Sequence, residues 1–189
     1  NWKKIFELRT LDFEEFLQFK KEDKLLSDVI KLKTDKIKKS TQEARIKTLL
    51  EEYIIYGGYP AVTLSKTIEE KIEKLDEIKN SYVKRDITDS RVSNDLNFYK
   101  LLQMLSNQTG NLLNINELSK ALRMSNATIE NYLYILQKCF HISLVKPFYS
   151  NLKKELVKMP KLYFNDLGLR NSILNYFAPL DTRLDKGAL

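Results

Sequence analysis

The sequence predicts a mainly α-helical protein whose second half is a winged helix-turn-helix with a small β-hairpin. The first observation is a helical spacing of apolar residues in two neighbouring segments that are joined by a short turn. The second is a pair of apolar runs, 141–148 and 156–164, separated by a polar segment. A helix pair followed by a hairpin is the order of a winged helix. The two helix faces are Leu118, Ala121 and Leu122, then Ile129, Leu133, Leu136 and Phe140.

Three polar residues stand where helix N-caps belong. Ser125 can accept a hydrogen bond from the backbone of Thr128 and so begin the second helix of the pair. Asp12 precedes Glu15 by three residues, which is the spacing of a capping box with aspartate in the Ser/Thr place. Thr67 precedes a long amphipathic stretch. We therefore expect helices to begin at these positions.

The other expected helices follow from apolar spacing and from glycine. One opens at Thr41 and ends at Gly57-Gly58, and another leads from Leu96 to Gly110. A short helix closes the chain after a turn at Asp166. Residues 20–39 are so rich in lysine and aspartate that we expect much of this segment to be a solvated linker, although Leu25, Leu26, Val29 and Ile30 could support a helical turn or two.

Composition places the chain among soluble globular proteins. Its 189 residues are 43% hydrophobic and 30% charged, and no apolar run approaches the ~20 residues of a membrane span. Cys139 is the single cysteine, so no internal disulfide can form and a reducing cytoplasm is the simplest location. The net charge is +7, and most of it falls in the second half. This asymmetry permits contact with nucleic acid or with an acidic protein surface.

Few residues offer chemistry for catalysis. The one histidine, His141, lies between a predicted helix and a predicted strand, where a structural role is more common than a catalytic one. One cysteine and one histidine do not make a zinc site, and no metal site is predicted. The chain has no Gly-x-x-x-x-Gly-Lys-Ser/Thr loop for a triphosphate. It does not look like a self-contained enzyme.

Gly57-Gly58-Tyr59-Pro60 is the most unusual tetrapeptide. Two glycines permit a positive φ or a close approach of the backbone, and the proline then fixes the chain again. A helix C-cap followed by a turn is the simplest interpretation of this pattern.

Contact with DNA is one of two interpretations of the winged helix. The second helix presents Asn126, Thr128 and Asn131, which are residue types that contact base edges. The hairpin region carries lysines that can contact phosphates, namely Lys153, Lys154 and Lys158. The helix has no arginine, however, and winged helices also serve as structural or protein-binding modules.

Several stretches in order resemble the AAA-type ATPases of archaea and bacteria that carry a C-terminal, nuclease-like domain of unknown function. These stretches are Leu11-Asp-Phe-Glu-Glu-Phe-Leu17, Tyr56-Gly-Gly-Tyr-Pro-Ala-Val62, Tyr82-Val-Lys-Arg-Asp-Ile87, Pro147-Phe-Tyr-Ser-Asn151 and Lys158-Met-Pro-Lys-Leu-Tyr-Phe-Asn-Asp-Leu-Gly-Leu-Arg-Asn171. The resemblance covers nearly the whole chain. One departure is Thr10-Leu11-Asp12, where members more often have Pro-Leu-Ser.

The resemblance implies a domain order. Residues 1–10 would end a truncated ATPase core, 11–91 would form an α-helical lid, 92–176 a winged helix, and 177–189 the start of a truncated C-terminal domain. The P-loop core and the acidic residues of the nuclease core would lie outside these 189 residues. An intact ATPase would bind ATP with Mg²⁺, whereas this chain alone would bind no cofactor.

The resemblance also implies roles for individual residues. Gly57, Gly58, Tyr59 and Pro60 would pack beside the adenine nucleotide, and Arg85 and Asp86 would couple the lid to the core or to a neighbouring subunit. The main hypothesis is that nucleotide state repositions the winged helix through the helix from Thr67 to about Arg85, with DNA, another copy or the ATPase core as partner. The alternative is a winged-helix DNA-binding protein with a helical dimerisation domain.

Overall fold

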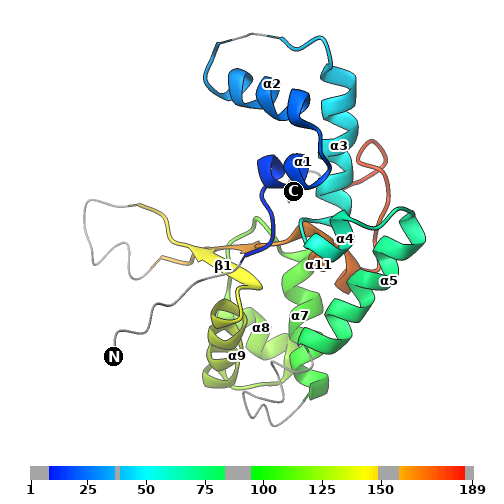
Figure 1. The fold of residues 1–189 in the computed structure, drawn as a ribbon. Helices are drawn as coiled ribbons and strands as arrows, with labels where there is room; N and C mark the ends of the chain where they lie inside the picture. Colours follow the sequence, from blue (N-terminus) through cyan, green and yellow to red (C-terminus); the bar gives the residue numbers. More distant parts are fainter. Residues whose placement is uncertain (1–8, 37–38, 84–94, 149–157, 186–189) are drawn as a thin grey trace, which may run out of the picture.

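A computed structural model describes residues 9–36, 39–83, 95–148 and 158–185 (Figure 1). The protein is mainly helical with one small antiparallel sheet, which confirms the predicted fold class at this level. The elements in chain order are α1 (Phe13–Phe19), α2 (Asp23–Lys33), α3 (Glu43–Tyr56), α4 (Pro60–Thr63), α5 (Ile68–Ile78) with its π-helical extension η1 (Lys79–Val83), α7 (Asp95–Asn107), α8 (Ile115–Leu122), α9 (Asn126–Lys138), β1 (Ile142–Val145), β2 (Lys161–Phe164) and α11 (Leu167–Leu174).

The three predicted helix starts are confirmed. Asp12 and Thr67 each cap a helix through a complete capping box, in which the side chain of the third helical residue returns to the cap backbone. The Ser125 hydroxyl accepts the backbone N–H of Thr128 at 3.1 Å and so starts α9. The expected start at Thr41 was close, because α3 begins at Glu43.

The expectation of a solvated linker across residues 20–39 was wrong. Eleven of these residues form α2, and Leu25 is buried beneath it. Helix α2 folds back on α1 and α3 to enclose a small core with Phe16, Leu17 and Leu49. Leu25 is the one buried residue of this helix, and a single buried position is a weaker periodic signal than the lysines around it, so charge content was a poor guide to this segment.

A second, larger hydrophobic core holds the rest of the protein together. It includes Val62 and Leu75 from the first predicted region and Leu102, Leu133 and Leu162 from the second. The core is therefore continuous between the ranges 11–91 and 92–176. Helix α11 lies in the middle of it, in contact with α3, α5 and α7.

The sheet pairs β1 with β2 so that Ile142 lies opposite Phe164 and Val145 lies opposite Lys161. A third segment adds to the outer edge of β2, because Leu112 forms an isolated bridge with Lys161. This segment connects α7 to α8, so it ties the start of the helix pair to the hairpin.

Two predicted members of the helix faces are placed differently by the structure. Ala121 is exposed on α8. Phe140 lies beyond the end of α9 and is 39% exposed, because the chain turns at Cys139 before the helical period can return it to the core. Cys139 itself is half-buried. None of the helices in the described ranges is long and apolar enough to span a bilayer.

Candidate functional site

The two glycines of the unusual tetrapeptide end α3 in a very crowded place. Gly57 has a φ of +77°, and a Cβ there would lie 2.1 Å from Oδ1 of Asp166. A Cβ at Gly58 would lie 2.2 Å from the carbonyl oxygen of Leu11. Both distances are far inside van der Waals contact, so glycine is required here by neighbouring protein atoms. Three segments that are distant in sequence meet at this turn.

The segment before α1 is bound to the turn through its backbone. The N–H of Leu11 donates to the carbonyl of Gly58 at 2.9 Å, and the Tyr53 hydroxyl donates to the carbonyl of Leu11 at 2.8 Å. Burial, with a smaller contribution from Asp166, raises the pKa of Tyr53 to about 12. The phenol therefore stays protonated and keeps its role as a donor.

Asp166 joins the turn to α11. Its Oδ1 accepts the N–H of Leu169 at 2.9 Å as the N-cap of α11, and its Oδ2 accepts the N–H of Gly58 at 2.8 Å. The side chain is buried, and burial raises its pKa, although the hydrogen bonds from Gly58, Leu169, Thr10 and Gly168 oppose that shift. One carboxylate thus caps a helix and fixes a turn 108 residues away in the chain.

Helix α11 also closes the open end of α3. The Asn171 amide donates to the carbonyls of Ile54 and Ile55 at 3.2 and 2.8 Å, and these are among the last carbonyls of α3. A Cβ on Gly168 would lie 2.0 Å from the carbonyl oxygen of Tyr56, so the two helices touch through backbone. This junction fixes the direction in which Tyr59 and Pro60 leave the turn.

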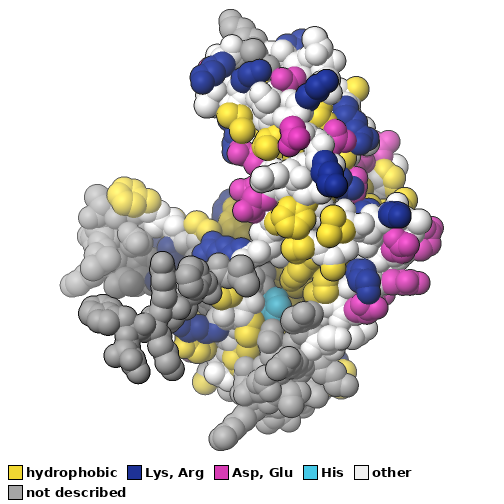
Figure 2. Space-filling model, viewed as in Figure 1, with side chains coloured by type: hydrophobic (Ala, Val, Ile, Leu, Met, Phe, Trp, Pro, Cys, Tyr) yellow, Lys and Arg dark blue, Asp and Glu magenta, His cyan; other side chains and the backbone are white. Residues whose placement is uncertain are grey.

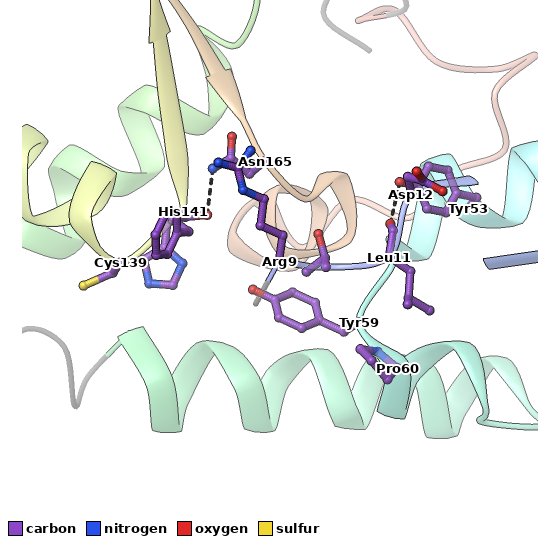
Figure 3. A pocket seen from close by; sticks show the side chains of 11 residues that line it. Arg9, Leu11, Asp12, Tyr53, Tyr59, Pro60, Cys139, His141 and Asn165 are labelled. Atoms are coloured by element: carbon purple, nitrogen blue, oxygen red, sulfur yellow. Dashed lines mark hydrogen bonds between the residues drawn. The ribbon is translucent and has the colours of Figure 1, made fainter. Parts of the chain in front are cut away.

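A cavity of about 490 Å³ opens directly beyond the turn (Figure 3). Its wall is built from three places: the segment before α1, the tetrapeptide, and the base of the hairpin. Figure 2 shows a concave surface between the N-terminal helices and the hairpin, with hydrophobic side chains and a visible part of the largely buried histidine in it. The lining side chains include Arg9, Asp12, Tyr59, Pro60, Phe140, His141 and Asn165.

The cavity combines flat apolar surfaces with a few polar groups. Tyr59 and Pro60 lie on one side of it, and the Arg9 side chain extends toward Asn165 (Figure 3). The guanidinium of Arg9 lies 5.8 Å from the ring centroid of Phe140, within the range of a cation–π contact. Within the described ranges no group of three His, Cys, Asp or Glu side chains is placed to hold a metal ion. The arrangement suits a planar organic ligand.

A family described as a domain of unknown function, DUF8612, matches residues 47–180. The chain belongs to this family. The match includes the tetrapeptide, both strands and α11, but not Arg9 or the rest of the segment before α1.

Three similar proteins extend the comparison but are uncharacterised. An uncharacterized protein of Methanocaldococcus jannaschii is 28% identical over 90% of this chain and 37% of its own length. One of Haemophilus influenzae is 29% identical over 85% of this chain and 37% of its own, and one of Mycobacterium tuberculosis is 25% identical over 68% and 28%. This DUF8612 chain thus spans 28–37% of the length of these relatives. No solved structure matches significantly.

The structure separates the four residues predicted to contact a nucleotide into two pairs. Tyr59 and Pro60 line the 490 Å³ cavity. Gly57 lines only a smaller neighbouring one of about 250 Å³, and Gly58 packs on Leu11. The glycines thus pack against Asp166 and Leu11 and do not line the 490 Å³ cavity themselves. The residues predicted to couple the lid to the core, Arg85 and Asp86, lie outside the described residues.

The residues predicted to contact DNA are only partly available on the surface. Asn126 and Asn131 are exposed on α9, but the Asn126 amide already donates to Asn116 at 2.7 Å. The Thr128 hydroxyl is hydrogen-bonded to Ser125. Lys158 is exposed just before β2, while Lys153 and Lys154 lie outside the described residues.

Sequence reasoning missed most of the cavity wall. Asn165 stood within a stretch that carried the family resemblance, so a signal existed, but it was given no role. Arg9 and Phe140 gave no signal, because one precedes the first helix and the other was assigned to a buried helix face. Only folding brings them to Tyr59.

Proposed function

We propose that this chain is the lid and winged-helix region of an ATP-binding protein of the AAA type. In this proposal an adenine nucleotide lies beside Tyr59 and Pro60, and its presence alters the position of the hairpin. The observation that carries the proposal is the composition of the cavity wall, which the tetrapeptide and the base of the hairpin form together. A ligand there contacts both regions at once, so it favours one relative position of the two.

The order and pairing of elements support the winged-helix part of the proposal. Helices α7, α8 and α9 are followed by a hairpin, and the short turn between α8 and α9 is that of a helix-turn-helix. The bridge between Leu112 and Lys161 adds a strand-like segment from between the first and second helices to the last strand. A small sheet built in this way is what the proposal expects of the wing of a winged helix.

The cavity fits the base of an adenine nucleotide. Its volume of about 490 Å³ lies within the range of roughly 300–1,000 Å³ that small-molecule sites occupy. An aromatic ring and a proline offer flat surfaces for a purine, and Asn165 offers a polar edge. The phosphates and Mg²⁺ would be held by a P-loop domain outside these residues, since the chain has no such motif.

The structure suggests a shorter route of coupling than the long helix that starts at Thr67. The hairpin base already touches the cavity through His141 and Asn165, and Asn165 follows β2 directly and precedes Asp166. In the proposal a bound base therefore acts on the hairpin by contact, and α5 supports the wall that carries Tyr59.

Equilibrium titration of the natural full-length protein with ATP, ADP and adenosine tests the proposal. Tyr59→Ala should weaken nucleotide binding about tenfold, since stacking on an aromatic side chain contributes roughly 1–3 kcal/mol. Pro60→Ala should weaken binding and reduce turnover as well. Tyr134→Ala, an exposed tyrosine on α9 outside the cavity, is the matched control. Unchanged affinity and turnover in both cavity variants would refute the proposal.

Contact with DNA is the second candidate function, in line with the alternative of a winged-helix DNA-binding protein. It is supported by the exposed side chains of Asn131 and Lys158 and by the absence of carboxylates among the described residues of the hairpin, 142–148 and 158–164. Binding to a fluorescent random duplex should weaken steeply with salt. Replacing Lys153, Lys154 and Lys158 with alanine should abolish binding. A duplex that does not bind at low salt would leave the winged helix as a structural or partner-docking module.

A further inference from the structure

Helix α9 ends in a turn that is usually built with glycine. The N–H of His141 donates to the carbonyl of Leu136 at 2.9 Å, and the N–H of Phe140 donates to that of Gln137 at 3.1 Å. These two bonds define a Schellman motif, in which the residue after the C-cap adopts a left-handed conformation. Phe140 occupies that position with a φ of +58°. A bulky residue in this region of backbone space is strained.

Packing does not explain why an aromatic residue occupies this strained position. The Phe140 side chain is 39% exposed, whereas its predecessor Cys139 packs against the main core. Four other helix ends, at Lys21, Asp35, Arg123 and Asn175, also have left-handed residues, but their side chains are polar. A large apolar ring that is strained and half in solvent is kept for a purpose other than stability.

Asn165, the residue directly after β2, holds the strained turn in place. The Asn165 amide donates to the carbonyl of Phe140 at 2.8 Å, and the Asn165 N–H donates to the carbonyl of His141 at 3.0 Å. The Ser143 hydroxyl donates to Oδ1 of Asn165 at 2.6 Å and fixes the orientation of that amide. These bonds hold the turn so that Phe140 lines the 490 Å³ cavity.

We infer that Phe140 is a ligand-contacting residue, whose ring stacks on the planar base of the nucleotide in the cavity. The inference rests on the function proposed above and adds a contact from the hairpin side, facing the wall that carries Tyr59. The guanidinium of Arg9 beside the ring favours a ligand that combines a planar ring with negative charge. Asn165 acts as a positioning residue for this contact.

The test is Phe140→Gly in the natural full-length protein. Because glycine adopts the left-handed conformation without strain, the Tm of this region should rise by about 3 °C. Over the same change the affinity for ATP should fall about tenfold, since the aromatic surface is lost. Arg123→Gly makes the equivalent change at the end of α8, outside the cavity, and should raise the Tm without altering ATP affinity. Phe140→Tyr should retain the affinity.

Each other outcome overturns the inference in a distinguishable way. A fall in Tm for Phe140→Gly would show that the ring contributes to packing. ATP affinity that is unchanged in Phe140→Gly but weakened in Tyr59→Ala would remove Phe140 from the site and leave the proposed function intact. If the unaltered protein binds none of ATP, ADP and adenosine, both proposals fail together.

Discussion

The turns at the ends of α3 and α9 both need a residue with a positive φ, but the first has glycine at this position and the second has phenylalanine. Both are held by consecutive residues, since Asp166 binds the N–H of Gly58 and Asn165 binds the carbonyl of Phe140. At Gly57 the chain has the residue that the backbone prefers, and protein atoms occupy the place where a Cβ would lie. At Phe140 it has an aromatic residue whose ring lines an open cavity.

The difference separates a turn that stabilises the fold from a turn that, in the proposal above, contacts a ligand. The α3 turn is crowded and its buried polar groups have partners, so a change there should lower the free energy of unfolding. The α9 turn keeps strain that a single substitution would relieve. The link between β2 and α11 holds both turns through the adjacent residues Asn165 and Asp166.

The largest expected effect is at the junction between α11 and α3. In Gly168→Ala the new Cβ would lie 2.0 Å from the carbonyl oxygen of Tyr56, and backbone on both sides leaves little room to relax. We expect a loss of about 3 kcal/mol in the free energy of unfolding, measured by urea denaturation. Gln103→Ala, at an exposed position in α7, is the control. If Gly168→Ala were as stable as the wild type, the crowding around the α3 turn would not matter for stability, and the contrast with the α9 turn would be lost.

The next effect concerns the carboxylate that joins the glycine turn to α11. Asp166→Ala removes the N-cap of α11 and leaves the buried N–H of Gly58 without its acceptor. Together these losses should cost about 2 kcal/mol. Asp166→Asn keeps one acceptor oxygen and should lose less. Hydrogen exchange should show faster exchange of the Gly58 amide in both variants, and an unchanged rate would contradict the assigned role.

A smaller effect is expected where the segment before α1 meets the turn. Tyr53→Phe removes the hydroxyl that donates to the carbonyl of Leu11 but keeps the ring in contact with Phe13 and Phe16. The expected loss in the free energy of unfolding is about 1 kcal/mol. Because the pKa of Tyr53 is raised to about 12, its contribution is present below about pH 10 and disappears as the pH rises toward 12. Phenolate absorbance followed against pH in both proteins measures this.

The smallest effect lies beyond the junction, at the far side of α11. Asp185 binds the buried guanidinium groups of Arg170 and Arg183, which lower its pKa below the ordinary 3.8. A lowered pKa gives stability that is present above about pH 4 and is lost as the pH falls below it. The difference in Tm between the wild type and Asp185→Asn should therefore shrink from about pH 6 to about pH 3. A constant difference would show that the ion pairs do not contribute.

Local signals predicted most of the helices because each signal lies within a few residues of its effect. The caps at Asp12, Thr67 and Ser125 need only a polar side chain and a nearby N–H. Helix α2 was missed because its stability depends on packing against α1 and α3, which its own composition does not reveal. Phe140 was misplaced because periodicity does not record where a helix stops.

The candidate site was predictable only in part. The tetrapeptide was noticed because paired glycines followed by proline are locally unusual. Its partner Asp166 could be recognised locally as the start of a turn, but the hydrogen bond to Gly58 exists only in the folded protein. The cavity itself combines residues separated by up to 156 positions, from Arg9 to Asn165, and no local pattern encodes such a set.

The hydrogen bonds that join Leu11, Gly58 and Asp166 affect the order in which the chain folds during synthesis. During synthesis the N-terminal end of the molecule emerges first. The carbonyls of Ile54 and Ile55 and the N–H of Gly58, however, form their hydrogen bonds with Asn171 and Asp166, which lie more than a hundred positions later. Closing so long a loop costs conformational entropy before the contacts at its ends can stabilise it. This junction should therefore form late in folding. The small core of α1, α2 and α3 can form early on the ribosome, while the cavity is completed only once α11 has been translated.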